Sequence, residues 1–429
     1  MRVYLLVLLI AAAVTYLLTP LAYWVAARTG AITAVRDRDV HTVPTARLGG
    51  LAMTAGLVVA VTFASQMPFL SGVFATDQQA WAIVGGAVIV CLLGVADDIW
   101  DLDWMTKLAG QVLAALFIAW QGVQLVTFPI GGLTIGSPRL SLIVTVLVVV
   151  VVMNAVNFVD GLDGLAAGLI AIGGTAYFVY TYSLTVAASP TDYSNLATLV
   201  MAGLVGICLG FLPHNFYPAR IFMGDSGSMV LGLVLGAAVI VVTGNIDPGV
   251  AVDPSKQRTL IPILLPLAVI LLPLLDMVLA VLRRVGTGKS PFHPDRLHLH
   301  HRLLALGHSH RRAVIIMYLW TAVFAFGAVS LVWWPAETVA IGLGVAIVIA
   351  LLLTLGPLRS RGRFLDDDAV TAPEGIPTTV PRRAGVPSGA SPVVRSPVSG
   401  ATPSTAAPVP DPDPRPARTG PAHPEGTSR

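Results

Sequence analysis

The sequence predicts an all-α polytopic membrane protein with about eleven transmembrane helices and a disordered C-terminal tail. Hydrophobic residues make up 55% of the 429 residues and charged residues only 11%, whereas soluble domains carry roughly 25% charged residues. The apolar residues fall in runs of about 20, the length that a helix needs to cross a hydrocarbon core roughly 30 Å thick. Near the C-terminus, small and polar residues replace the bulky apolar ones. A water-soluble globular protein is therefore excluded.

The first apolar run has only Arg2 ahead of it and continues through Leu21 to Ala27. This run is too long for the core of a cleavable signal peptide, so we expect it to be the first membrane anchor. Ten further runs follow, and short polar segments separate the fifth from the sixth and the tenth from the eleventh, so the count carries a margin of one. The expected spans are 3–25, 48–66, 81–96, 108–126, 141–157, 164–184, 196–212, 227–243, 260–282, 313–334 and 337–356.

The distribution of Lys and Arg predicts the orientation of these spans. With eleven spans, the odd-numbered loops share the side of the C-terminus. Those loops hold thirteen basic residues, namely Arg28, Arg36, Arg38, Arg47, Lys107, Arg220, Arg283, Arg284, Lys289, Arg296, Arg302, Arg311 and Arg312. The opposite loops hold Arg139, Lys256 and Arg258. By the positive-inside rule, the odd loops and the C-terminus are cytoplasmic and the N-terminus is outside.

Two domains are expected, a transmembrane domain over 1–356 and a tail over 357–429. The tail begins with a basic cluster that suits an anionic inner leaflet, namely Arg359, Arg361 and Arg363. Beyond it, the sequence is rich in Pro, Ala, Ser and Thr and cannot bury enough surface to fold. An inert disordered cytoplasmic tail is favoured over a regulatory or docking arm.

Five polar clusters lie in or beside the odd loops, at 41–50, 96–111, 154–166, 215–228 and 290–303. Polar and ionisable residues at membrane depth are costly and commonly functional. The first cluster, which contains Arg47 and two glycines, is explained equally well by topology alone. Because five clusters share one face, we expect a ligand site there.

Adjacent carboxylates mark the second cluster, where Asp97 and Asp98 end an apolar run. They repel each other and need a cation, for which Mg²⁺ with a phosphate is the usual solution; a solvated acidic turn is the alternative. Lys107 follows Asp103 by one helical turn. It could pair with that carboxylate or serve as a counter-charge for a phosphate.

Two amides and two carboxylates define the third cluster, namely Asn154, Asn157, Asp160 and Asp163. Oxygen ligands at this density suit a hard divalent cation or the polar edge of a nucleotide.

The fourth cluster runs from Asn215 to Ser228 and contains Asp225 directly before a glycine-punctuated helix start. Backbone N–H groups at such a start can hold phosphate oxygens, and Asp225 could alternatively be an N-terminal cap. Phe222 offers a flat face for a base, or it is an interfacial anchor.

Histidines and arginines fill the fifth cluster, namely His298, His300, His301, Arg296 and Arg302. A Zn²⁺ site is the weaker interpretation, because the surroundings supply cations and oxygens and no thiolates. Imidazole and guanidinium donors that hold a diphosphate are favoured. His308 and His310 are expected at the surface.

Four of these motifs, in order, resemble the polyprenyl-phosphate N-acetylhexosamine-1-phosphate transferase family over residues 1–356. They are the Asp97-Asp98 pair, NAVNFVDGLDGLA from Asn154, FMGDSGS from Phe222 and HLHHRL from His298. The PFHPDRLHLHHRL loop is similar to the bacterial branch that loads N-acetylglucosamine-1-phosphate. The alternatives are a phospho-N-acetylmuramoyl-pentapeptide transferase and, in a different class, a transporter, whose site would lie near the bilayer midplane.

The resemblance implies UDP-N-acetylglucosamine as donor, undecaprenyl or decaprenyl phosphate as acceptor, UMP as by-product and a lipid-linked first intermediate of a cell-envelope polysaccharide. It implies Mg²⁺ as cofactor, with Mn²⁺ as a substitute, and a plasma-membrane enzyme whose site faces the cytoplasm. The lipid bilayer is a partner, a homodimer is one admissible assembly, and no nucleic-acid partner is expected.

The resemblance also assigns roles to individual residues. The expected catalytic residues are Asp97, Asp98, Asp160, Asp163, His298, His300 and His301. The expected substrate-binding residues are Lys107, Asn154, Asn215, Phe222, Arg296, Arg302 and Arg47. The expected metal ligands are Asp225 and Asn157.

The charge of the carboxylates and the ionisation of the acceptor phosphate bear on the reaction mechanism. Five converging carboxylates would repel a diphosphate, so a cation is required. Direct attack by the acceptor phosphate is favoured over an intermediate on Asp97, because a phosphate monoester with a second pKa near 6 is already largely ionised.

Overall fold

The computed structural model describes residues 1–33, 44–75, 78–125, 127–128, 133–134, 137–188, 194–244, 261–288 and 298–356. The described residues all belong to one compact unit. The predicted tail at 357–429 and Arg296 of the fifth cluster lie outside the described residues.

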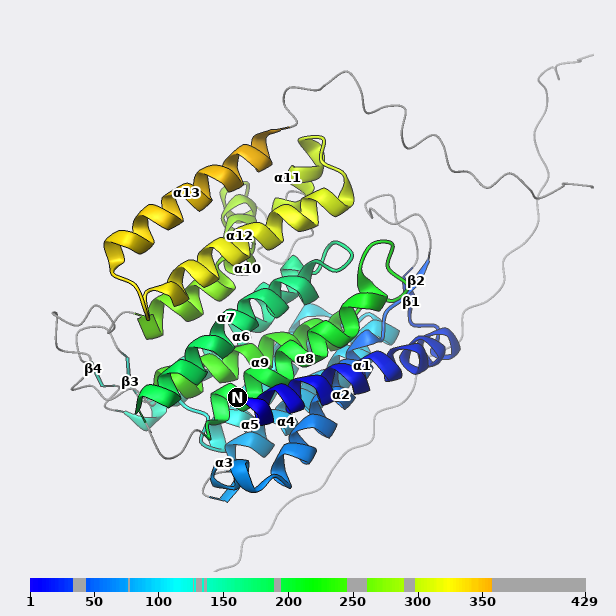
Figure 1. Ribbon diagram of the computed structural model, residues 1–429. Helices are drawn as coiled ribbons and strands as arrows, with labels where there is room; N and C mark the ends of the chain where they lie inside the picture. The colour runs from blue at the N-terminus through cyan, green and yellow to red at the C-terminus, as the bar shows by residue number, and fades with distance from the viewer. Residues whose placement is uncertain are drawn as a thin grey trace, which may run out of the picture. The chain divides into compact units, whose positions relative to one another are not determined.

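Helices dominate the described residues (Figure 1). They are α1 (Arg2–Thr29), α2 (Gly49–Ser65), the 3₁₀ helix η1 (Pro68–Leu70), α3 (Ser71–Ala75), α4 (Gln79–Trp100), α5 (Trp104–Trp120), α6 (Pro138–Val159), α7 (Leu165–Ala188), α8 (Leu196–Asn215), α9 (Gly224–Gly244), α10 (Ile261–Gly286), α11 (Leu299–Ala305), α12 (His310–Ser330) and α13 (Ala336–Leu355). Short antiparallel pairs join β1 (Ile32–Thr33) to β2 (Thr45–Ala46) and β3 (Thr127–Phe128) to β4 (Leu133–Thr134).

Each of the eleven predicted spans coincides with one of these helices. Within the described ranges, nine helices are long and apolar enough to cross a membrane. A tenth span arises if α2 and the η1–α3 segment, which meet at a 92° bend, are counted together. The one predicted span left over, 108–126, corresponds to α5, a shorter apolar helix of 17 residues. The helical multi-pass class is confirmed, whereas the count of eleven and the orientation remain predictions.

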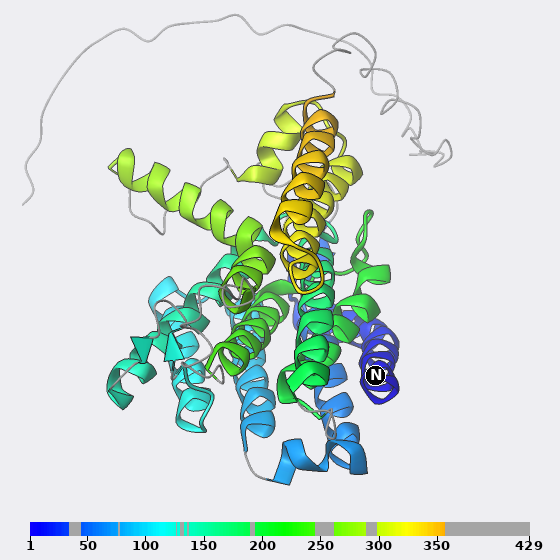
Figure 2. The same ribbon diagram turned by 60° about the vertical axis from the view of Figure 1, so that its left-hand side comes forward.

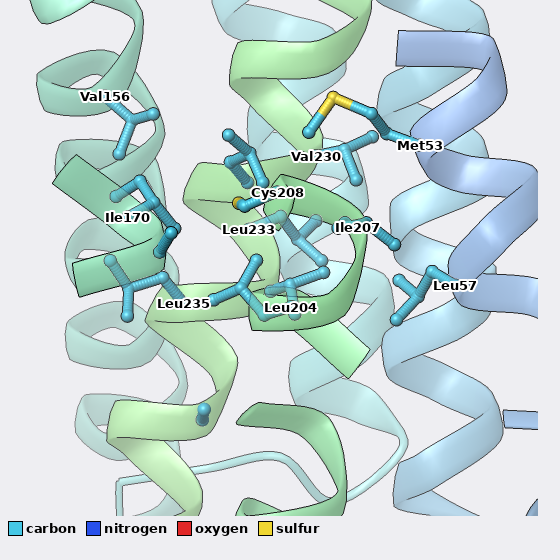
Figure 3. Packing of buried hydrophobic residues seen from close by; sticks show 14 of the residues in the cluster. Met53, Leu57, Val156, Ile170, Leu204, Ile207, Cys208, Val230, Leu233 and Leu235 are labelled. Carbon is cyan, nitrogen blue, oxygen red and sulfur yellow. The ribbon is translucent and has the colours of Figure 1, made fainter. Parts of the chain in front are cut away.

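The centre of the helical unit is α9, which is almost completely buried. It packs against α2, α4, α6 and α8. Figure 3 shows Val230 and Leu233 of α9 among apolar side chains of the neighbouring helices. By contrast, α13 packs mainly on α12 (Figure 2) and keeps most of its apolar surface exposed. An exposed apolar face of this kind fits a helix that contacts lipid.

Glycines bring the start of α9 close to its neighbours. A Cβ added to Gly94 of α4 would collide with the backbone of Ser226, and one added to Gly50 of α2 would collide with the backbone of Gly227. Only glycine permits this approach, which resembles the small-residue contacts of packed membrane helices. The carboxyl end of α4 and the amino end of α9 therefore meet at one end of the bundle, where the predicted polar clusters also lie.

Candidate functional site

Three carboxylates meet where α4 ends and α9 begins. Each of Asp97, Asp98 and Asp225 has a carboxylate oxygen within 4.8 Å of the others. Lys107 of α5 lies between two of them, with Nζ 2.6 Å from Asp97 Oδ2 and 3.0 Å from Asp225 Oδ2. The site thus combines hard oxygen ligands with one cation, from the consecutive helices α4 and α5 and from α9, which comes more than 100 residues later.

Pairing of Lys107 with Asp103 would leave the lysine outside this site, and that alternative is wrong. Asp103 is instead the N-cap of α5 and accepts hydrogen bonds from the backbone N–H groups of Met105 and Thr106. The cap geometry turns the Asp103 carboxylate toward its own helix start. Lys107 remains about a quarter exposed, so its charge is accessible to a ligand.

Asp98 has a different role from its neighbour Asp97. It is buried, and its two oxygens accept the backbone N–H groups of Asp225 at 3.1 Å and Ser226 at 3.2 Å. The interpretation of Asp225 as a cap is therefore wrong, because α9 already begins at Gly224 and the capping carboxylate comes from α4. These two N–H groups were predicted to hold phosphate oxygens, but they already donate to Asp98.

Gly224 is required at this junction. Its φ of +69° favours glycine, and an added Cβ would collide with the Asp98 carboxylate. The sequence FMGDSGS thus encodes a turn that brings Asp225 up to α4.

Asn157 of α6 completes the centre. Its Nδ2 donates to Asp225 Oδ1 at 3.0 Å and to Ser228 Oγ at 2.9 Å. A metal-ligand role requires the other amide atom, Oδ1, because an N–H₂ group cannot bind a cation. The structure therefore brings Asn157 to the predicted metal site, where its described contacts orient Asp225.

Asn154, one turn earlier on α6, binds a neighbouring helix. Its Nδ2 donates to Gln111 Oε1 of α5 at 2.7 Å and to the Val150 carbonyl at 2.8 Å. Gln111 is buried and lies one helical turn after Lys107. This amide pair fixes α5 against α6 at the depth of the site, so its described contacts are structural.

The turn between α6 and α7 is tied to the loop before α9. Asp163 Oδ2 accepts the Ala219 N–H at 2.8 Å. Asn215 accepts the Gly164 N–H at 3.1 Å and donates to the Ile221 carbonyl at 2.9 Å. Asp163 and Asn215 are each only 3% exposed. In the described structure they hold the turn in place, which limits their access to a nucleotide.

Asp160 lies in the same turn, close to the carboxylate centre. Removal from solvent, followed by the like charges of Asp225 and Asp98, raises the pKa of the Asp160 carboxyl to about 8. A carboxyl in this environment is easily neutralised or matched by a cation.

Helix α11 carries the imidazoles of the fifth cluster to the same region. The ring of His300 lies against Gly161, where an added Cβ would collide with it. Burial, followed by the neighbouring His301, lowers the pKa of His300 to about 3. His300 is thus a buried ring that stays neutral near neutral pH, and its contact with the diphosphate remains a prediction. Arg302 is also on α11, and its side chain is exposed.

His298 has a partner that the sequence analysis missed. Asp276 of α10 is 1% exposed, and its Oδ2 lies 3.0 Å from His298 Nδ1. Asp276 was overlooked because it lies inside a run that reads as an ordinary span. A carboxylate at that depth was itself the available signal.

The predicted surface positions of His308 and His310 are wrong. His308 is 5% exposed, and its Nε2 lies 2.8 Å from the Thr354 carbonyl of α13. His310 is half-buried, and its Nε2 accepts the backbone N–H of Asp163 at 3.1 Å. His308 thus links the start of α12 to α13, and His310 links α12 to the turn after α6. Contacts between segments so far apart in sequence cannot be predicted from the neighbouring residues.

The first cluster reaches the site through its backbone. Phe222 N–H donates to the Ala46 carbonyl at 2.8 Å, and the Phe222 carbonyl accepts the Gly49 N–H at 3.0 Å. The Phe222 ring is half-buried. Nε of Arg47 is buried and has no hydrogen-bond partner among the described residues. The described parts of all five clusters therefore lie at one end of the bundle, linked by contacts.

Comparison with known proteins identifies similar sequences. The model of glycosyl transferase family 4 matches residues 80–243. A decaprenyl-phosphate N-acetylglucosaminephosphotransferase of Mycolicibacterium smegmatis is 45% identical over 360 residues, which cover 82% of this chain and 88% of the relative. A probable undecaprenyl-phosphate N-acetylglucosaminyl 1-phosphate transferase of Bacillus subtilis is 32% identical over 339 residues, covering 79% and 86%. A phospho-N-acetylmuramoyl-pentapeptide-transferase of Corynebacterium jeikeium is 30% identical over 298 residues, covering 60% and 76%.

Proposed function

Because the chain belongs to glycosyl transferase family 4, we propose that it transfers N-acetylglucosamine-1-phosphate from UDP-N-acetylglucosamine to polyprenyl phosphate and releases UMP. The relative at 45% identity is named for decaprenyl phosphate and N-acetylglucosamine. The muramoyl-pentapeptide relative is more distant and is matched over a smaller share of this chain. Decaprenyl phosphate is therefore the favoured acceptor, and the product is the lipid-linked first intermediate of a cell-envelope polysaccharide.

The observation that carries this proposal is the shared contact of Lys107 with Asp97 and Asp225. A transfer between two phosphorylated substrates needs charge that can be matched to phosphate oxygens. Here the charged side chains lie at the ends of membrane helices, so an acceptor could keep its prenyl chain in lipid and its phosphate in water. A transporter site would be expected near the middle of the spans.

The donor set fits a divalent cation such as Mg²⁺. Carboxylate oxygens are the ligands that this hard ion prefers, and those of the three aspartates lie within 4.8 Å of one another. Because the Asp98 oxygens accept two backbone N–H groups, we assign the metal to Asp97 and Asp225, with Asn157 beside them. When bound, the ion would neutralise diphosphate charge and polarise the phosphoryl oxygens.

In the proposed reaction, an oxygen of the acceptor phosphate attacks the β-phosphorus of the donor. A new P–O bond forms, the bond between the β-phosphorus and the bridging oxygen breaks, and UMP leaves with that oxygen. The acceptor is already largely ionised at neutral pH, so no base is required. Lys107 holds the acceptor phosphate beside Asp97, Phe222 lies toward the base of the nucleotide, and the α11 imidazoles lie toward the diphosphate.

The site is assigned to the cytoplasmic face of the plasma membrane, where UDP-sugars are made. The support is the excess of Lys and Arg in the odd loops and the position of the described clusters at one end of the bundle. Labelling of the variants Thr45→Cys and Gln79→Cys, which place a thiol just before α2 and at the start of α4, on opposite expected sides of the membrane, would test the assignment. Labelling of Thr45 from the outside of intact cells would overturn it.

UMP release by the purified protein tests the function directly. We expect release from UDP-N-acetylglucosamine only with polyprenyl phosphate and a divalent cation, and much less from UDP-N-acetylmuramoyl-pentapeptide. Asp225→Ala should abolish release while the protein still folds. Asn195→Ala, which removes a polar side chain at the amino end of α8, away from Asn215 at the other end of that helix, serves as the control and should keep UMP release. Transport of a sugar in proteoliposomes without UMP release would favour the rival class.

A further inference from the structure

Asp276 is a fully buried carboxylate in an apolar membrane helix. It lies in α10, a helix otherwise composed almost entirely of aliphatic residues, and is 1% exposed. A charge in such a place is costly unless it is paired and hydrogen-bonded. Both oxygens are engaged: Oδ2 lies 3.0 Å from His298 Nδ1, and Oδ1 accepts the Leu299 N–H at 2.8 Å.

Both contacts act on the start of α11. His298 is the N-cap of that helix and makes no side-chain cap hydrogen bond itself. A helix of seven residues has little stability of its own, because nucleation costs more than so few hydrogen bonds return. Asp276 therefore provides the cap from a neighbouring helix and holds the His298 ring at the same time.

The remaining contacts of His298 restrict its ring further. It stacks on His300 with a 3° interplanar angle and a centroid distance of 5.6 Å. It also meets the edge of Phe158 of α6 at 5.8 Å. The Arg284 guanidinium lies 5.3 Å from the centre of the same Phe158 ring. The imidazole is thus held between α10, α11 and α6, yet 12% of its side chain stays exposed.

This arrangement has a chemical consequence. When Nδ1 donates to a carboxylate, Nε2 is the nitrogen left for another partner, and the carboxylate stabilises an imidazolium that would donate from Nε2. Carboxylates orient histidines in this way in metal and hydrolase sites, where their loss typically costs 10–100-fold in function.

We propose that Asp276 is a positioning residue that orients His298 through Nδ1 and so presents Nε2 to the diphosphate of the donor. The proposal rests on the proposed function and adds a residue to its machinery. Asp276 itself touches no substrate. It acts only through His298 and through the helix start that His298 caps.

A double-mutant cycle separates positioning from simple structural support. We expect Asp276→Asn to lower kcat/KM for UDP-N-acetylglucosamine about 10- to 100-fold, with a smaller change in KM for polyprenyl phosphate. In a His298→Gln background the same substitution should add less than about threefold. Thr321→Val, a buried polar change on α12, which packs on α10, is the control and should leave kcat/KM unchanged.

The outcomes distinguish the two proposals. Absence of UMP release from the wild-type protein would overturn the proposed function. An active wild type with an unchanged Asp276→Asn variant, or full additivity with His298→Gln, would overturn the role of Asp276 alone. If Asp276→Asn does not fold, Asp276→Glu is tested in its place, because it keeps the charge and shifts it by one methylene. Wild-type kcat/KM in that folded variant would also overturn the role.

Discussion

The carboxylate of Asp98 accepts the backbone N–H of Asp225 at 3.1 Å, so the end of α4 caps the helix that carries a central carboxylate of the site. The adjacent Asp97 accepts the local Leu102 N–H through Oδ1 at 2.8 Å and turns Oδ2 toward Lys107. The two consecutive aspartates therefore have different roles: Asp98 holds α9 in place, and Asp97 faces the proposed ligand.

Asp98→Ala should lower both the free energy of unfolding and the rate of UMP release. Loss of a cap costs about 1–2 kcal/mol, and the free energy of unfolding in detergent should fall by that amount, with UMP release lost as Asp225 shifts. Asp97→Asn should lose UMP release with a smaller change in stability. Wild-type stability of Asp98→Ala would contradict the capping role.

Lys107→Met should strengthen cation binding while weakening turnover. Lys107 occupies oxygens of Asp97 and Asp225, so its charge competes with a metal for the same atoms. Removing it should tighten Mg²⁺ binding about tenfold, equivalent to about 1.4 kcal/mol, and should lower UMP release because the acceptor phosphate loses its counter-charge. Calorimetric titration of metal-free protein measures the first effect. Weaker Mg²⁺ binding in the variant would count against a shared site.

Gln111→Leu and Asn154→Leu should each destabilise the protein more than the double variant does. Either change alone leaves the other amide, buried in Gln111 and half-buried in Asn154, without its partner on the neighbouring helix. The cost is about 1 kcal/mol in a membrane helix pair, whereas the double change leaves neither amide. Turnover should fall in both single variants because Lys107 and Asn157 lose their relative position. Thr145→Val, which removes the hydroxyl that accepts the Leu125 N–H at the other end of α6, is the control and should spare turnover. Additive losses would refute the coupling.

His300 should make the protein less stable in mild acid. Its pKa is about 3 in the folded protein and about 6.5 in the unfolded chain. Below pH 6.5 the unfolded chain binds a proton that the folded protein does not, so the free energy of unfolding falls with pH. Between pH 7 and pH 5 the loss should be about 2 kcal/mol, and His300→Gln should remove this share. An unchanged pH dependence in His300→Gln would exclude His300 as its source.

The length of the apolar runs predicted every membrane helix that contributes to the site. It did not predict α11, whose seven residues form no such run. The sequence also indicated that Asp97, Lys107, Asn157 and Asp225 would converge, since their clusters fall in loops of one side. The sequence pattern could not reveal which polar side chains bind other parts of the protein and which are left to bind a ligand. Asp98 and Asn215 look the same in sequence as residues that bind a ligand, but they accept hydrogen bonds from backbone groups of distant segments.

Asp276 is a residue that the sequence pattern did not mark as part of the site. A single carboxylate inside a long aliphatic run changes mean hydropathy little, so the run was read as an ordinary span. Its partner, His298, comes 22 residues later, and nothing local links the two. Spans with one ionisable residue therefore merit separate attention when such sequences are interpreted.

The contact of Gly94 with the Ser226 backbone has a consequence for how variation in this protein is interpreted. A methyl group there would push α4 away from the start of α9, and so move Asp97 away from Asp225, although residue 94 itself carries no reactive group. Loss-of-function alleles at this position would resemble defects of a reactive group. Normal protein levels together with an altered distance between α4 and α9 would show that such an allele had lost a packing contact and had kept every reactive side chain.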